Sequence, residues 1–132
     1  MQSKAILSQT EVSQILAAAR AEAQANQWAV TIAIVDDGGH LLALERLDGC
    51  APIAAYIAAE KARTSALGRR ESKGYEEMVN GGRTAFLSAP LLTSLEGGVP
   101  ILVDGQVVGA VGVSGVKAEQ DAQVAKAGVQ CL

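Results

Sequence analysis

Apolar residues fill two pairs of short stretches in this chain, and each pair reads as a β-hairpin. In the first, Thr31 and four apolar residues cover 31–35, an Asp-Asp-Gly-Gly turn follows at 36–39, and His40 and four apolar residues cover 40–44. In the second, apolar residues recur on both sides of Asp104-Gly105, a dipeptide that is strongly favoured in tight hairpin turns. The strands of the first hairpin are apolar at nearly every position, so we expect that part of the sheet to be covered on both faces.

Apolar residues three and four apart predict three helices around these hairpins. The first, over 8–25, opens with the Ser-x-x-Glu spacing of a capping box. The second, over 52–68, opens on a proline and ends on a glycine, and the third covers 118–130. The segment 69–90 is expected to be irregular, with one short helix at 75–79. A connection of that length often has a function or lies in an interface.

This order of elements predicts an α+β fold in which helices cover an antiparallel sheet. The β-α-β alternation of a doubly wound parallel sheet is absent. A chain of 132 residues is long enough for one domain and short for two, so we expect a single domain over 1–132.

The composition changes this picture in one respect. Apolar residues make up 49% of the chain but aromatic residues only 3%, so Ala, Val, Ile and Leu must form the core. Small side chains imply a close approach of helices to the sheet. The 14 glycines and the many alanines also favour apolar surface that is buried when copies associate.

Charge and targeting signals exclude several classes of function. A net charge of −3 and a pI near 5.1 give no basic surface for nucleic acid, so no nucleic-acid partner is expected. No signal peptide and no run of about 18 apolar residues is found, so we expect a cytoplasmic protein without a membrane partner. Cys50 and Cys131 are isolated, which predicts reduced thiols and no metal site.

Three charged residues form the first candidate site. Arg46 ends a predicted strand, Lys61 lies in an alanine-rich helix, and Glu96 precedes a glycine pair. If the hairpins are neighbours, these side chains would meet at one end of the sheet, with Arg83 as a further cation. Arg and Lys would then hold a small carboxylate, and Glu96 could act as a catalytic base. The alternative is that these residues form surface ion pairs or subunit contacts.

Two further sets of residues could contribute. His40 is the only histidine, so any imidazole chemistry must use it, although a structural hydrogen bond explains it equally well. Gly97 and Gly98, with the polar Ser114, could let backbone approach a ligand. Glycines that serve only turns and tight contacts are the alternative. No nucleotide-binding glycine motif, nucleophile elbow or zinc-ligand spacing is present.

Long blocks of the sequence resemble one known family from end to end. They include VDDGGHLLALERLDG, APLLTSLEGGVPILVDGQVVGAVGVSG and DAQVAKAG. The chain is similar to the GlcG/HbpS family, whose members are also called haem-degrading domain proteins. The resemblance implies a profilin-like, three-layer α/β/α domain with a five-stranded antiparallel sheet. It also implies homo-oligomers, octamers included.

The same resemblance narrows the function without fixing it. Some members are encoded beside glycolate oxidation genes, and others bind haem or belong to diol-degradation systems. We therefore expect a protein that binds a small carboxylate or haem, or an accessory protein of glycolate or hydroxy-acid utilisation. If haem binds, His40 could be the axial ligand, with Met78, Tyr56 and Tyr75 as poorer candidates.

Two alternatives remain open. One is an enzyme that uses Glu96 or His40 in acid/base chemistry on a small carboxylate, as a tautomerase, hydratase or deaminase would. The other is a structural module whose apolar surface serves assembly alone.

Overall fold

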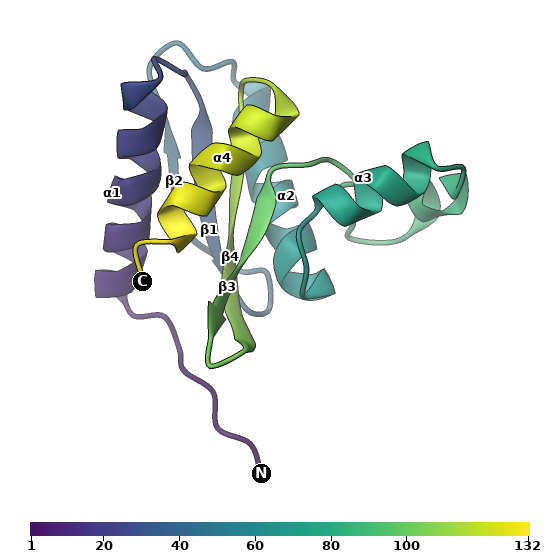
Figure 1. Cartoon of the computed structure of the whole chain (residues 1–132), viewed down its shortest axis with the longest axis horizontal. Helices are drawn as coiled ribbons and strands as arrows, with labels where there is room; N and C mark the ends of the chain where they lie inside the picture. Colours follow the sequence, from purple (N-terminus) through teal and green to yellow (C-terminus); the bar gives the residue numbers. More distant parts are fainter.

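Helices and strands follow one another in the order that the hydrophobic pattern predicts (Figure 1). The computed structural model describes the whole chain, residues 1–132. Its elements are α1 (Gln9–Ala25), β1 (Thr31–Asp36), β2 (Leu41–Arg46), α2 (Ile53–Gly68), α3 (Lys73–Asn80), the 3-10 helix η1 (Thr84–Ser88), β3 (Gly98–Val103), β4 (Gln106–Ser114) and α4 (Ala118–Val129). Both predicted hairpins and all three long helices are confirmed.

The sheet has four antiparallel strands in the order β2-β1-β4-β3. The five-stranded sheet implied by the family resemblance is therefore wrong for this chain. The two hairpins supply every strand, because the remaining apolar residues lie in helices or in the connections between elements. Residues 1–8 run as a segment without strand pairing (Figure 1).

α1 and α4 cover one face of the sheet. Ile15 of α1 and Val124 of α4 are fully buried and pack with Ile32, Ile34 and Val111 of the central strands. The first turn of α1 is capped as predicted, because the Glu11 carboxylate accepts a hydrogen bond from the Ser8 N–H at 2.8 Å. The larger side chains of the core therefore gather between these two helices and the sheet.

α2 covers the other face through a stripe of alanines. Ala54, Ala58, Ala62 and Ala66 recur every fourth residue and are all buried. A Cβ atom at Gly112 of β4 would collide with the backbone of this helix, so glycine there allows the close approach that the composition predicts. The three-layer α/β/α arrangement is confirmed by these two separate apolar clusters.

The expectation that the first hairpin is covered on both faces is confirmed for β1 and wrong for β2. β1 is buried along almost its whole length, whereas Leu41, Leu42 and Leu44 of β2 are 55%, 43% and 39% exposed. β2 is an edge strand, and the helices lie over the central strands β1 and β4.

The segment after α2 is more regular than predicted. The short helix expected at 75–79 lies inside α3, and η1 follows it. Residues 73–95, which we call the arm, extend sideways from the body of the molecule (Figure 1). Tyr75 and Phe86 pack against each other within the arm, with ring centroids 5.8 Å apart and the ring planes tilted by 50°.

No helix of the structure combines the length and the apolar character that crossing a membrane would need.

Candidate functional site

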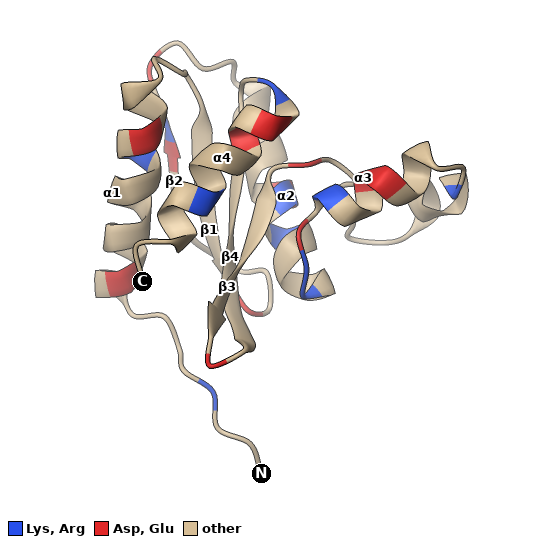
Figure 2. Cartoon of the chain, in the orientation of Figure 1, with Lys and Arg blue, Asp and Glu red and all other residues tan.

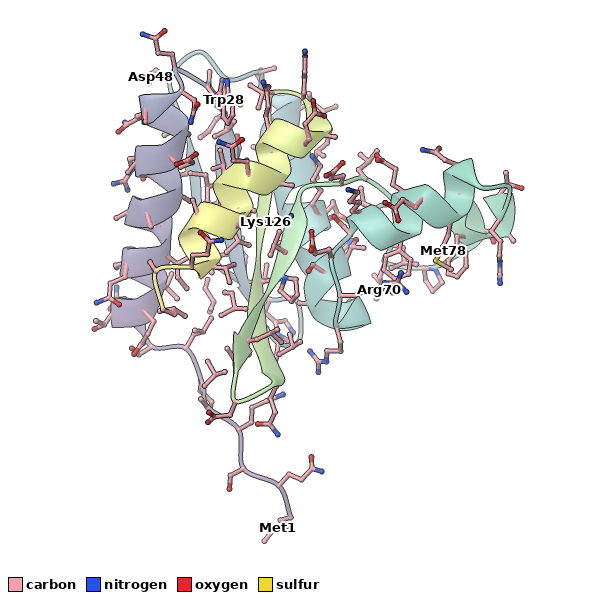
Figure 3. The ribbon with its side chains drawn as sticks, viewed as in Figure 1. Met1, Trp28, Asp48, Arg70, Met78 and Lys126 are labelled. Carbon is pink, nitrogen blue, oxygen red and sulfur yellow. The ribbon has the colours of Figure 1, made fainter.

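A groove of about 410 Å³ lies between α4, the last turn of α1 and the base of the arm. We call it the Glu96 groove. Its lining residues are Glu22, Lys73, Glu96, Glu119, Ala122, Gln123, Lys126, Ala127 and Gln130. Charged residues of both signs lie on the helices that border it (Figure 2), and Lys126 lies on α4 (Figure 3).

Glu96 and two lysines give the groove its chemistry. The Glu96 side chain is only 13% exposed, and its Oε2 lies 4.0 Å from Lys73 Nζ. Lys126 Nζ lies 3.6 Å from Glu71 Oε1. Both distances exceed that of a hydrogen bond, so each ammonium keeps donors for a ligand. The Glu96 N–H is held by Glu76 Oε1 at 3.4 Å, which links Glu96 to the arm.

A buried ion pair lies next to the backbone that follows Glu96. Lys61 Nζ donates to the carbonyl oxygen of Val113 and to Asp121 Oδ2, both at 3.0 Å. The two side chains are 4% and 3% exposed. A Cβ atom at Gly97, where φ is +135°, would lie 2.8 Å from Lys61 Nζ. Glycine at this position therefore leaves room for the lysine.

Asp121 joins α4 to the end of β4. Its Oδ1 accepts a hydrogen bond from the Val116 N–H at 3.1 Å, while its Oδ2 binds Lys61. Burial raises the pKa of the Asp121 carboxyl above its ordinary value, and the nearby Lys61 ammonium and the Val116 N–H act in the opposite direction. The ion pair is therefore an internal support of the site, and the Lys61 ammonium is not open to a ligand.

The structure brings some of the predicted site residues together. Gly97 and Gly98 lie against Lys61. Gly98 also forms two hydrogen bonds with Ser72: the Gly98 N–H donates to Ser72 Oγ at 2.8 Å, and the Gly98 carbonyl oxygen accepts from the Ser72 N–H at 3.0 Å. Ser114 is at the end of β4, opposite Thr31, and is 7% exposed.

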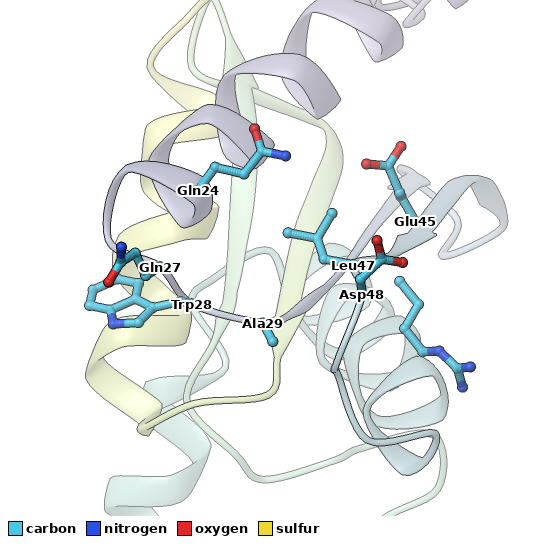
Figure 4. A pocket seen from close by; sticks show the side chains of 8 residues that line it. Gln24, Gln27, Trp28, Ala29, Glu45, Leu47 and Asp48 are labelled. Atoms are coloured by element: carbon cyan, nitrogen blue, oxygen red, sulfur yellow. The ribbon is translucent and has the colours of Figure 1, made fainter.

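Arg46, Lys61 and Glu96 do not form ion pairs with one another. Arg46 instead lines a second, open groove of about 490 Å³, which Trp28 borders on one side and Glu45 and Asp48 on the other (Figure 4). Glu45 in that groove is held by Arg20 at 2.5 Å, and this hydrogen bond lowers the pKa of the Glu45 carboxyl, against a smaller opposing effect of burial.

Arg83 lies in the arm, with its guanidinium carbon 4.7 Å from the ring centroid of Phe86. It is not among the residues that line the Glu96 groove. The pocket that the sequence predicts from Arg46, Lys61, Glu96 and Arg83 is therefore not assembled within one chain.

His40 lies at the turn between β1 and β2 with its side chain 80% exposed. Its Nδ1 is 3.1 Å from Asp36 Oδ1. Partial burial would raise the pKa of Asp36, but hydrogen bonds from the N–H groups of His40 and Gly38 and the contact with the His40 ring outweigh it and lower that pKa. The arrangement matches the structural hydrogen bond that the sequence left open for His40.

The four residues that could bind haem iron do not fit a haem site within a single chain. His40 and Tyr56 are largely exposed, while Tyr75 and Met78 lie in the arm, and none of the four lines a groove. No group of three or more His, Cys, Asp or Glu side chains is arranged to hold a metal ion.

Sequence reasoning missed Lys73, Lys126 and Asp121. An exposed lysine on a helix gives no sign of the groove that it borders, so Lys73 and Lys126 had no distinguishing signal. Asp121 had one, because a lysine in an alanine-rich helix needs a carboxylate partner once it is buried. The partner lies 60 residues further along the chain, and nothing in the local pattern identifies it.

Comparison with known proteins supports one family for residues 7–130. The family model described as "Haem degrading protein HbpS-like" matches residues 7–130. Protein GlcG of Escherichia coli K12 is 73% identical over 114 residues, which cover 86% of this chain and 85% of that protein.

Solved structures agree with this assignment. The Klebsiella pneumoniae protein ORFY superposes with a TM-score of 0.91 at 27% identity and covers 99% of this chain and 93% of its own. A complex of PduOC with haem superposes with a TM-score of 0.87 at 26% identity and covers 97% and 96%. The resemblance drawn from the sequence blocks is thus confirmed, and the chain belongs to the HbpS-like family.

Proposed function

We propose that this protein binds a small 2-hydroxy carboxylate in the Glu96 groove and serves as an accessory binding protein in glycolate or other hydroxy-acid utilisation. The observation that carries the proposal is the pair of loosely held ammonium groups, Lys73 and Lys126, in a groove that also contains the largely buried Glu96. The high identity to GlcG supports the link to glycolate, which the family resemblance implies.

The charges of the groove favour a hydroxy acid over a simple acid. Its lining holds three carboxylates, from Glu22, Glu96 and Glu119, and two ammonium groups. A ligand that offers only negative charge meets repulsion there. A 2-hydroxy acid offers its carboxylate to a lysine and the proton of its hydroxyl group to a carboxylate such as Glu96, so both signs of the groove are used.

Calorimetric titration tests this proposal. We expect saturable binding of glycolate and at least tenfold weaker binding of acetate, which lacks the hydroxyl donor. Lys73→Gln and Lys126→Gln should each weaken glycolate binding about tenfold or more, because a hydrogen bond to a charged group contributes about 1.5–3 kcal/mol. Lys4→Gln is the matched control, since Lys4 pairs with Asp37 outside the groove. Equal binding of glycolate by all four proteins, or none by the wild type, would overturn the proposal.

Binding without turnover is favoured over catalysis by the separation of the two predicted acid/base residues. Glu96 is in the groove, whereas His40 is at the turn between β1 and β2 and lines no groove. An enzyme of this kind would have to use Glu96 as its base. Loss of a candidate acid from solution that Glu96→Gln abolishes would establish the enzyme; an unchanged acid concentration would leave binding as the function.

Haem is the second candidate ligand, and the PduOC–haem complex is the observation that favours it. The test is a hemin titration followed by the Soret absorption, with His40→Ala beside the wild type. Saturable one-to-one binding that His40→Ala weakens would make haem a ligand of this chain. Absence of a specific Soret shift would reject haem and leave the small carboxylate.

A further inference from the structure

A second cavity adjoins the Glu96 groove. It has a volume of about 380 Å³ and lies along β3, the edge strand of the sheet, where α4 packs beside it (Figure 1). We call it the β3 trough. It is lined by Glu71, Val99, Pro100, Leu102, Lys126, Val129 and Gln130. Lys126 and Gln130 also line the Glu96 groove, so a molecule held at Lys126 borders both cavities.

The two cavities differ in chemistry. Apart from Ala122 and Ala127, every residue that lines the Glu96 groove is charged or carries a side-chain amide. The residues of the β3 trough that the groove does not share are apolar except for Glu71. Leu102 among them is 56% exposed, so its side chain is open to contact. The β3 trough therefore suits an apolar group, and the Glu71 carboxylate disfavours a second negative charge there.

Lys126 stands at the border of the two cavities with an ammonium group that is free to bind a carboxylate. Its Nζ lies 3.6 Å from Glu71 Oε1, which is beyond hydrogen-bond distance, and its side chain is 48% exposed. All three donors of the ammonium group are therefore available to a ligand. A ligand carboxylate on Lys126 leaves the rest of the molecule next to Glu96 on one side and next to the β3 trough on the other.

The free edge of β3 is poorly suited to an added strand. Gly98, at its start, already uses its N–H and its carbonyl oxygen in hydrogen bonds with Ser72. Pro100 has no N–H, and a proline in an edge strand normally has its nitrogen on the solvent side. The register with β4 also shifts between Ile101 and Leu102. A small molecule therefore fits this edge better than another strand does.

We infer that the Glu96 groove and the β3 trough together bind a 2-hydroxy monocarboxylate that has an aliphatic side chain. The inference rests on the proposed function and narrows its substrate class. The carboxylate of the ligand binds Lys126, its hydroxyl group donates to Glu96, and its side chain packs on Leu102 and Val129 in the β3 trough. Glycolate has no side chain and does not reach the trough.

Calorimetric titration of the wild type with three acids tests the substrate class. 2-Hydroxy-4-methylpentanoate, which has the side chain of leucine, should bind about fivefold or more tightly than glycolate, because part of that side chain leaves water. 2-Hydroxysuccinate, whose side chain carries a second carboxylate, should bind no more tightly than glycolate. If glycolate binds and 2-hydroxy-4-methylpentanoate binds no better, the inference fails and the proposed function stands. Binding of none of the three acids would remove both.

Variants of the trough test where the side chain lies. Leu102→Ser should lower the ratio of the affinity for 2-hydroxy-4-methylpentanoate to that for glycolate by about threefold or more, because it removes apolar contact. Leu87→Ser is the matched control and should keep the ratio, since Leu87 is 69% exposed in the arm and lines none of the cavities. Val129→Thr replaces Leu102→Ser if the circular dichroism spectrum shows that the latter is unfolded. An unchanged ratio in the folded variant would overturn the inference.

The two enantiomers of 2-hydroxy-4-methylpentanoate provide an independent test. The inference gives the carboxylate, the hydroxyl group and the side chain three different partners around one carbon atom, so only one enantiomer can make all three contacts. We expect the affinities of the enantiomers to differ by about fivefold or more, because the weaker one loses a hydrogen bond to a charged group or the apolar contact. Equal affinities would show that the acid only adheres to apolar surface, and would overturn the inference.

Discussion

Replacing Lys61 with methionine is the most informative test of how this site is supported. Methionine has nearly the length of lysine but no charge. The change would leave Asp121 as a buried carboxylate without its counter-ion, and the carbonyl oxygen of Val113 would lose a donor at 3.0 Å. Both charged side chains are at most 4% exposed, so water cannot replace the lost partner.

The expected loss of unfolding free energy follows from the burial of both charges. Removing one partner of a buried ion pair costs about 3–5 kcal/mol. The whole free energy of unfolding of a typical domain is about 5–15 kcal/mol, so Lys61→Met should remove a large share of it. For a chain of this length each kcal/mol lowers the melting temperature by about 3–5 °C, which gives a fall of about 10–25 °C.

Urea unfolding followed by the fluorescence of the single tryptophan, Trp28, measures the effect. Lys126→Met is the matched control, because the Lys126 side chain is 48% exposed and should cost less than about 1 kcal/mol. Adding Asp121→Asn to Lys61→Met removes the uncompensated charge but keeps an acceptor for Val116, so at least half of the loss should return. A cost for Lys61→Met no larger than that for Lys126→Met would show that the buried ion pair does not support the fold.

Three further predictions concern backbone, pH and the arm. Gly97→Ala should destabilise the protein by about 2–4 kcal/mol, because it adds a clash with Lys61 to the strain of a positive φ. Gly105→Ala has the same kind of strain but no atom within 4 Å of the added Cβ, so it should cost only about 1 kcal/mol. Equal losses in thermal melts would contradict this. Arg20 lowers the pKa of Glu45, so the stability that Glu45 contributes is present above its ordinary pKa of 4.5 and is lost as the pH falls below it. The difference in unfolding free energy between the wild type and Glu45→Gln should therefore shrink on acidification. A difference that is constant with pH would exclude the effect. Ser72→Ala removes the hydroxyl that holds the Gly98 N–H, and hydrogen exchange of the arm amides should then quicken more than that of β1 amides.

The architecture could be predicted largely from local patterns, and the exceptions have physical reasons. Asp104-Gly105 and the capping box at Ser8 act locally, so the second hairpin and α1 appear as expected. The leucines of β2 have the same pattern as a buried strand, and only the position of β2 at the edge of the sheet makes them exposed. The regular structure of the arm depends on Tyr75 meeting Phe86 eleven residues later, which no helical or strand period describes.

The candidate site was predictable only where its residues are adjacent in the chain. Glu96, Gly97 and Gly98 stand together in the sequence; Glu96 lines the groove, and the two glycines that follow it lie against Lys61. Lys61 was singled out correctly as unusual, but its partner Asp121 comes from a helix 60 residues away. Arg46 and His40 were chosen for their chemistry, and the sheet order places them away from Glu96 on other parts of the surface.

A titration of the ¹⁵N-labelled protein with glycolate, followed by amide NMR spectra, tests directly whether the Glu96 groove binds this ligand. We expect saturable shifts that are concentrated on the amides of Glu96, Gly97 and the α4 residues that line the groove, and we expect Lys73→Gln to lose them. Shifts that gather instead around Arg46 and Trp28 or around His40, or no shifts at all, would contradict this expectation.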